Sequence, residues 1–318
     1  MPPNRMLDLK HENGLHVGNT TRIDLHYHAN VYGLSRRLRR KRVRLTRRIV
    51  ADGGLACLAS TEHSYKNPLE AYHHLLEVAE GGCTHVLPGV EAVSSENVEV
   101  IFLFRDEDHL RKGLGLLPSF GWSCRDAARI AAELDCITSI PHPFHICRSA
   151  AGNVLSSDAY AALLNMVDYV EIHNSSALTI SCRLFGPMTR SLFRRSLHKL
   201  HATLDLPPEK RGRGLGWAIG SDAHFPQEQF IVGETGQQLC EGETYFDMLR
   251  RRIRFMPYGM VSLFEQGLSN DMSLLRNCRS AMQEGIIKKY CKTLFQAGVY
   301  ATALPFISAA PAFLTKIR

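Results

Sequence analysis

The sequence predicts an α/β fold in which strands alternate with helices around a parallel, barrel-like sheet. Two observations lead to this prediction. Short apolar runs typical of buried strands alternate with segments whose apolar residues recur at helical spacing. Short groups of His and carboxylate residues also follow several of these apolar runs directly. Strands that alternate with helices form parallel sheets, and the number of strands expected here favours closure into a barrel.

The first half of the chain contains the most clearly bounded elements. Residues 21–28 form a buried strand that delivers His26 and His28 at its end. Residues 34–51 form a helix, because their leucine and isoleucine side chains fall on one stripe, and the Gly53-Gly54 pair ends it. Three more strands are expected at residues 55–60, 84–87 and 98–104, with a helix at residues 68–79 between the first two.

The second half continues the alternation. A helix at residues 124–134 leads into a strand at residues 136–140, and a helix at residues 159–166 leads into a strand at residues 169–172. A last strand, residues 217–219, ends at Ser221. We therefore expect seven strands between residues 21 and 219.

Five short segments rich in His and carboxylate side chains stand where these strands end. They are Asp24-Leu25-His26-Tyr27-His28, Thr61-Glu62-His63, Gly89-Val90-Glu91, Pro141-His142-Pro143 and Ser221-Asp222-Ala223-His224. Imidazole nitrogens and carboxylate oxygens bind borderline divalent cations. Strand side chains alternate between faces, so His26 and His28 point the same way and can bind one metal. Because sites in such folds gather at the carboxyl ends of the strands, the sequence predicts a multinuclear metal site there.

These segments, in this order, resemble the PHP (polymerase and histidinol phosphatase) domain family, and in particular its free-standing bacterial phosphoesterases. The resemblance covers about residues 22–263. It implies a distorted (β/α)7 barrel that hydrolyses phosphate esters with two or three divalent metal ions, Mn2+, Zn2+ or Fe2+. We expect an N-terminal lead-in at residues 1–20, a PHP phosphoesterase domain at 21–264 and a helical C-terminal extension at 265–318.

The resemblance also implies roles for the residues of these segments. One metal would be surrounded by His26, His28, Glu91 and Asp222. Glu91 would bridge to a second metal that His142 also binds, and a third metal would be held by His63 and His224. Either of these last two imidazoles is a candidate to protonate the leaving oxygen. Arg148 stands where relatives place an arginine that grips the phosphate, although an exposed arginine is an equally good interpretation.

Three further residues have two open interpretations each. Glu99 stands one strand after Glu91, where relatives carry a ligating His, and is either a replacement ligand or a solvated strand residue. Glu62 either binds metal or orients His63. Asn174 either contacts the substrate or supports the ligands, or it simply caps a loop.

Composition and charge indicate anionic partners and a reducing compartment. The 318 residues carry a net charge of +7, and nine of the thirteen residues between Arg36 and Arg48 are Arg or Lys. This basic helix either attracts nucleic acid or is a solvated face. Nine cysteines without a Cys-x-x-Cys motif, and an N-terminus without an apolar signal core, favour the cytoplasm. The uncharged segment 297–314 is expected to pack on the barrel and not to anchor a membrane.

Together these features predict a metal-dependent phosphoesterase whose substrates are nucleotides or oligonucleotides. The alternatives are a phosphomonoesterase for small molecules such as histidinol phosphate, a hydrolase of carbon–nitrogen bonds of the amidohydrolase type, and a nucleic-acid-binding module with a vestigial site.

Overall fold

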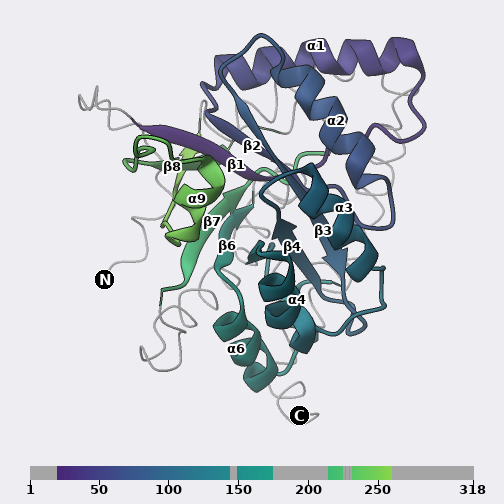
Figure 1. Ribbon diagram of the computed structural model, residues 1–318, viewed down its shortest axis with the longest axis vertical. Coiled ribbons are helices and arrows are strands. Elements are labelled where there is room, and N and C mark those ends of the chain that lie inside the picture. The colour runs from purple at the N-terminus through teal and green to yellow at the C-terminus, as the bar shows by residue number, and fades with distance from the viewer. Residues whose placement is uncertain are drawn as a thin grey trace, which may run out of the picture.

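A nine-stranded sheet forms the centre of the protein in the computed structural model, which describes residues 20–143, 149–174, 214–224, 226, 229 and 231–259. Its strand order is β7-β6-β5-β4-β3-β2-β1-β8-β9, and Figure 1 labels all of these strands except β5 and β9. The strands are β1 Thr21–Tyr27, β2 Cys57–Ser60, β3 His85–Val93, β4 Glu99–Leu103, β5 Ile137–Ile140, β6 Tyr169–Asn174, β7 Gly216–Gly220, β8 Ile231–Thr235 and β9 Met256–Gly259. The helices are α1 Arg36–Asp52, α2 Pro68–Ala79, α3 Glu107–Leu116, α4 Ala127–Leu134, α5 Ala151–Val154, α6 Ser157–Met166 and α9 Tyr245–Arg250.

All seven expected strands and all four expected helices are present. Ser35 caps α1 by accepting from Leu38 N, and the backbone turns at Gly54, whose φ is +59°, as the glycine pair predicted. The fourth helix segment begins as a short 3-10 turn, Cys124–Asp126, before α4. The short elements α3, α5, α9, β8 and β9 were not predicted.

The prediction of a parallel sheet is wrong for one of the seven strands. β4 runs antiparallel to both β3 and β5, whereas β1, β2 and β3 are mutually parallel, as are β5, β6 and β7. The reason is the short connection between β3 and β4, a turn closed by Ser94 N donating to Val98 O at 2.9 Å. A connection of this length makes a hairpin, since a parallel crossover needs a dozen or more residues.

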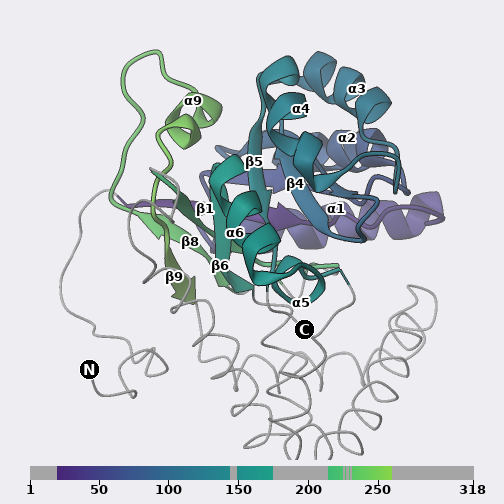
Figure 2. The same cartoon turned by 90° about the horizontal axis from the view of Figure 1, so that it is seen from below.

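The two ends of the sheet approach each other and nearly close it into a barrel. Tyr27, at the end of β1, makes a parallel bridge with Ala223 just after β7, and His28 N donates to Ala223 O at 3.1 Å. Helices α1 to α4 cover the outside of the sheet, while β8, β9 and α9 lie at the other side (Figure 2). The α/β barrel-like fold class is thereby confirmed.

Two hydrophobic clusters fill the two sides of the sheet. Alternate residues of β2 divide between them: Leu58 packs under the helices, whereas Cys57 and Ala59 face the interior, which Tyr169, Phe246 and Phe255 also fill. α9 contributes Phe246 to this interior and so closes the end of the barrel away from the polar segments.

A β-bulge in β1 decides which way its histidines point. Asp24 pairs with Leu58 and Tyr27 with Ser60, so β1 advances three residues where β2 advances two. Because of the extra residue, Tyr27 packs with the helix-facing cluster, while Ile23 before the bulge and His26 after it both face the interior. The predicted alternation of His26 and His28 therefore holds only from the bulge onward.

Several predictions fall outside the described residues. These are residues 1–19 of the lead-in, Arg148, and the whole C-terminal extension at 265–318, which includes the apolar segment 297–314. Within the ranges that are described, no helix combines the length and apolar character needed to cross a bilayer.

Candidate metal centre

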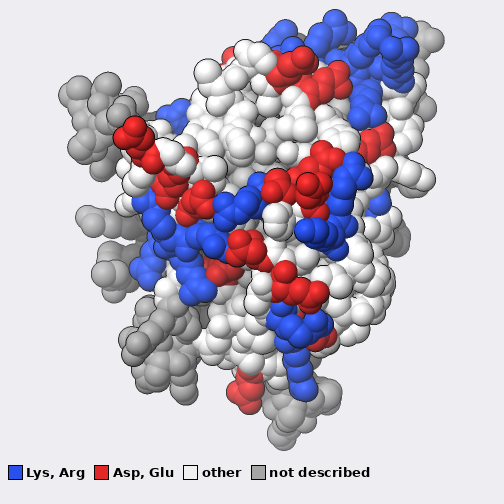
Figure 3. Space-filling view, in the orientation of Figure 1, with Lys and Arg blue, Asp and Glu red and all other residues white. Residues whose placement is uncertain are grey.

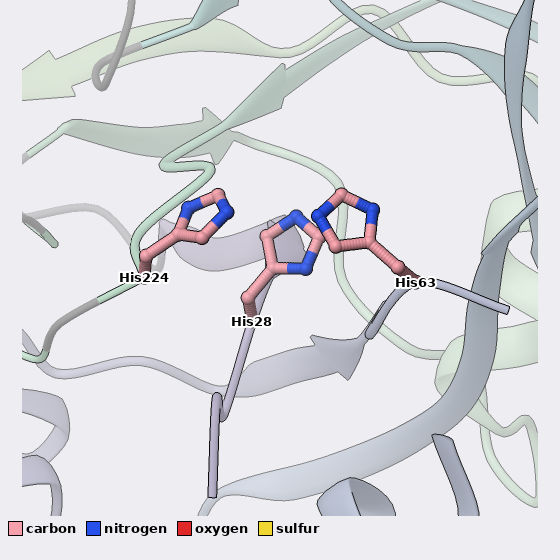
Figure 4. Close-up of side chains that lie close together, drawn as sticks. All are labelled: His28, His63 and His224. Carbon is pink, nitrogen blue, oxygen red and sulfur yellow. The ribbon is translucent and has the colours of Figure 1, made fainter. Parts of the chain in front are cut away.

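The carboxyl ends of the strands bring the predicted His and carboxylate side chains together inside the barrel. Their ligand atoms form four overlapping groups of three, in each of which the atoms lie within 4.8 Å of one another. The groups are His28, His63 and His224; His26, His28 and Glu91; His26, His142 and Asp222; and His63, Glu91 and Glu99. Figure 4 shows the ring of His28 between those of His63 and His224, with ring centroids 4.4 and 4.3 Å away.

Glu91 occupies the middle of these groups. Its Oε1 lies 3.4 Å from His26 Nε2 and 3.3 Å from His142 Nε2. Its Oε2 lies 2.7 Å from His63 Nδ1 and 3.5 Å from His28 Nε2. The carboxylate is fully buried and thus divides its two oxygens between two sets of imidazoles, which is the geometry of a bridging ligand.

Asp222 approaches the same histidines from the opposite edge of the sheet. Its Oδ1 lies 3.3 Å from His28 Nε2, 3.7 Å from His26 Nε2 and 3.4 Å from His224 Nδ1. Its backbone φ is +47°, and that of His142 is +28°, both in the left-handed region that such residues rarely adopt. Strained backbone of this kind persists where the surrounding structure fixes it, and it clusters at functional sites.

The donor atoms fit divalent cations better than they fit one another. His63 Nδ1 and Glu91 Oε2 are only 2.7 Å apart, yet their contact lacks hydrogen-bond geometry, and neither atom has another hydrogen bond among the described residues. His26 Nε2 and His28 Nε2, by contrast, lie 3.0 Å apart and form a hydrogen bond when one of the two nitrogens carries a proton. Buried polar atoms are normally paired, so atoms that converge without pairing indicate a missing common partner. A set of imidazole nitrogens and carboxylate oxygens suits zinc, iron or manganese.

The pKa values of the buried carboxylates and imidazoles are shifted by burial and by the charges of their neighbours. Burial alone would raise the pKa of Glu91, but His63 and His26 hold it well below its usual range. Burial alone would lower the pKa of His26, and the carboxylates of Asp222, Glu171 and Glu91 reverse this and raise it. Burial lowers the pKa of His63. The shifts of Glu91 and His63 favour the ionised carboxylate and the neutral imidazole, which are the forms of these side chains that bind metals.

Glu171, for which no role was predicted, supports the centre. Its Oε1 lies 3.2 Å from His26 Nδ1, and its Oε2 accepts from His142 N at 2.6 Å. A carboxylate that holds the far nitrogen of a ligating imidazole fixes the tautomer and orientation of the ring. A lone Glu in the apolar strand 169–172 was the available signal.

Asp24 plays a second supporting role that the sequence analysis missed. Its fully buried carboxylate accepts from His26 N at 3.2 Å, from Ser221 N at 2.9 Å and from Gln229 Nε2 at 2.8 Å. Asp24 therefore satisfies an amide exposed by the bulge of β1 and ties that strand to the segment carrying Asp222. Burial raises the pKa of its carboxyl.

The structure distinguishes the two glutamates whose roles were open. Glu99 points into the centre, with Oε2 3.6 Å from His142 Nε2 and accepting from Ser149 Oγ. Burial and the charge of Glu91 raise its pKa to about 7.

Glu62 lies instead behind His28, with Oε1 3.4 Å from His28 Nδ1, and it takes part in none of the four groups. It also accepts from Asn30 N and Lys66 Nζ. Its Oε1 accepts from His63 N at 3.3 Å as well, so Glu62 contacts the ring of His28 and the backbone of His63.

Asn174 is likewise turned toward the ligands. Its side-chain amide donates to Glu171 Oε2 at 3.0 Å and to Asp222 Oδ2 at 3.2 Å, and the residue is 7% exposed. This placement fits the interpretation in which Asn174 supports the ligands. Arg148, the predicted phosphate-gripping residue, lies outside the described residues.

Comparisons with known proteins show likeness in fold at low sequence identity. No family model and no curated protein sequence matches the chain. The structure is similar to PsfC from Pseudomonas syringae, with a TM-score of 0.51 and 14% identity over 80% of this chain and 98% of PsfC.

Two other solved structures align with it at lower TM-scores. A two-domain protein from Bacteroides vulgatus containing a predicted PHP-like metal-dependent phosphoesterase has a TM-score of 0.45 and 17% identity over 79% of this chain and 70% of that one. The lesion-specific endonuclease PfuEndoQ from Pyrococcus furiosus has a TM-score of 0.46 and 16% identity over 76% of this chain and 60% of PfuEndoQ. The fold predicted for this chain, an α/β sheet nearly closed into a barrel, is thus the fold it shares with PsfC.

Proposed function

We propose that this chain is a metal-dependent phosphoesterase of the PHP type. The observation that carries the proposal is the buried convergence of His26, His28, Glu91, His142 and Asp222 at the carboxyl ends of separate strands. The order of the segments along the chain supports the same family. Glu91 would hold two cations, His63 and His224 would complete a third position, and Glu171, Asn174 and Glu62 would orient the ligands.

The residues of the centre suit hydrolysis of an anionic ester. Divalent cations bound there would neutralise phosphoryl oxygens and lower the pKa of water toward neutrality. His224 Nδ1 lies 3.0 Å from Asp222 O, so Nδ1 carries the proton and Nε2 keeps its lone pair. The side chain of His224 is 26% exposed, against 12% for His63. His224 is therefore the more accessible of the two candidates, and it could protonate a leaving oxygen only while its Nε2 carries a proton and binds no metal.

A screen for released inorganic phosphate tests this proposal. Nucleotides, short RNA and DNA, and sugar phosphates are incubated with the full chain and added Mn2+. Phosphate or nucleotide release that disappears with a chelator is expected. Hydrolysis of amides without any hydrolysis of phosphate esters would favour the amidohydrolase-type alternative, and protein that binds no metal would favour the vestigial site.

Glu99 gives a specific test of the ligand set. We expect Glu99→Ala to lose one metal equivalent with little change in thermal stability, because its carboxylate faces His142 and Glu91 and is a candidate ligand. Metal content by mass spectrometry, together with a melting curve, measures both. An unchanged metal count would leave Glu99 as a residue that only accepts a hydrogen bond from Ser149.

The substrate we propose is a nucleotide or oligonucleotide, on the evidence of α1. Seven cationic residues of this helix are exposed: Arg36, Arg37, Arg40, Lys41, Arg44, Arg47 and Arg48. Figure 3 shows Lys and Arg gathered over α1 at the upper right. Arg42, by contrast, is buried and donates to the carbonyls of Ala29 and Asn30, directly after His28. α1 is thereby fixed to the loop that follows the ligand His28.

Salt dependence tests the role of this helix. Counterion release scales with the number of phosphates contacted, so activity on oligonucleotides should fall steeply with salt, while activity on a small chromogenic phosphoester should barely change. Replacing Arg36, Arg40 and Arg44 by Gln should flatten the slope by about three, if each contacts one phosphate. These three are exposed and spaced four residues apart on one stripe of α1.

The matched control removes the same charge elsewhere. Lys112, Arg125 and Arg129 are exposed on and near α3 and α4, and their replacement by Gln should leave the slope unchanged. Equal salt sensitivity for both substrates would make α1 a solvated face and favour the small-molecule phosphomonoesterase.

A cytoplasmic location remains part of the proposal. The free thiols of Cys57, Cys124 and Cys136, all buried, support it, because reduced cysteines are typical of that compartment.

A further inference from the structure

Two exposed aromatic residues, Tyr65 and Phe120, lie at the edge of the metal centre, and the functions assigned so far use neither. Each is 58% exposed. We call this pair the aromatic rim. Single exposed apolar residues are common on proteins, so the position of this pair, and not its exposure alone, calls for an explanation.

Tyr65 is in direct contact with a candidate metal ligand. Its ring stacks on that of His63, with centroids 4.8 Å apart and an angle of 12° between the planes. One face of the phenol is therefore covered by His63, while more than half of the residue remains open to solvent. His63 Nδ1 lies 2.7 Å from Glu91 Oε2, so only the ring of His63 stands between Tyr65 and the carboxylate of Glu91.

Phe120 is held beside the same centre by a tight turn. Its backbone N donates to Val93 O at 2.9 Å, and Val93 pairs with Glu99 across β3 and β4. Ser119 Oγ lies 2.9 Å from Ser64 Oγ, which joins this turn to the segment that carries Tyr65. Phe120 adopts a φ of +61°, a costly conformation for a bulky residue. The fold thus maintains an exposed ring in a strained conformation, next to the serine pair that links the two segments.

We propose that the aromatic rim, and Tyr65 in particular, stacks against the planar base of a nucleotide substrate while its phosphate occupies the metal centre. This inference rests on the proposed phosphoesterase function and adds the substrate's planar group to it. A base would stack on the uncovered face of Tyr65, and His63 would support the opposite face. Stacking of a base on an aromatic side chain tolerates any base, because every base has a π-face. The rim would therefore select nucleotides over aliphatic phosphoesters without selecting one base.

Matched substrates and variants of the full chain test the proposal. Adenosine 5′-monophosphate carries a planar base and glycerol 3-phosphate does not. We expect Tyr65→Leu to raise KM for the nucleotide by about 10-fold, within the range measured for lost base stacking, and to leave kcat and KM for glycerol 3-phosphate unchanged. Tyr65→Phe keeps the ring and should behave as the unchanged protein does. Phe120→Leu should raise KM for the nucleotide by a smaller factor.

The alternative is that Tyr65 only holds His63 in place. In that case Tyr65→Leu would lower metal content and would impair both substrates equally, and either result would overturn the proposal. Metal content and melting temperature are therefore measured for each variant.

Binding of adenosine, which has no phosphate, separates this inference from the proposed function. We expect the unchanged protein to bind adenosine weakly in a titration by nuclear magnetic resonance, with loss of binding in Tyr65→Leu and retention in Tyr65→Phe. If neither phosphoester is hydrolysed but adenosine binds in this pattern, the phosphoesterase proposal fails and the aromatic rim stands. If phosphoesters are hydrolysed but adenosine does not bind, or binds equally to Tyr65→Leu, the rim proposal is overturned and the phosphoesterase stands.

Discussion

Replacing Glu91 by Gln is expected to reduce metal content and to lower turnover by more than the ~10–100-fold typical of losing a residue that only orients a ligand. Glu91 places its two oxygens near four different imidazoles, so the substitution removes a negative charge from the middle of the centre. An amide is isosteric with the carboxylate but cannot bridge two cations as a charged ligand does. The measurements are metal content per chain and kcat for a phosphoester that the unchanged protein hydrolyses.

The control for this substitution is Glu77→Gln, which neutralises an exposed glutamate on α2. It should leave metal content and activity unchanged. Retention of the full metal content and normal turnover in Glu91→Gln would show that Glu91 does not bridge, and would remove the main support for a multinuclear centre.

Adding one methyl group at Gly220 is expected to damage the centre without replacing any ligand. A Cβ at this position would collide with Glu171 Oε1 and with His26 Cβ. Gly220 cannot move away easily, because it is paired with Asn174 in the parallel ladder between β6 and β7. Gly220→Ala should therefore displace Glu171 from His26, and overpacking of this kind destabilises proteins by about 1–3 kcal/mol.

Metal affinity and the free energy of unfolding measure the two parts of this effect. Gly115→Ala is a matched control, because a Cβ on that residue of α3 meets no atom within 4 Å. It should keep metal affinity and stabilise the helix by up to about 1 kcal/mol. Equal behaviour of the two alanine variants would mean that the interior around Glu171 is loose, contrary to the contacts described above.

The sequence was sufficient for the parts of this structure that depend on local pattern. Apolar runs marked the strands, and the His and carboxylate residues at their ends marked the ligands, because such folds place sites at the carboxyl ends of strands. Helices α1 and α2 were predicted nearly to their termini, since Gly53-Gly54 and Pro68 mark boundaries in the chain itself.

The features that escaped prediction depend on contacts between distant segments. Glu171 becomes important only because β6 lies close enough for its carboxylate to reach His26, 145 residues earlier. The direction of β4 follows from a turn at residues 94–98 that carries no strong hairpin signal. β8 forms against β1 and β9 in an antiparallel extension of the sheet, and its five residues include one glycine and one glutamate, which mask a strand pattern.

The bulge in β1 makes the centre sensitive to the length of that strand more than to its composition. His26 and His28 face inward only because one extra residue shifts the alternation between Asp24 and Tyr27. Deleting a single residue there would turn both imidazoles toward α1 and α2 at once, and the apolar Tyr27 would be turned into the barrel. Variation among chains with this architecture should therefore allow substitutions along β1 while excluding insertions and deletions, and the spacing from Ile23 to His28 should behave as a fixed quantity.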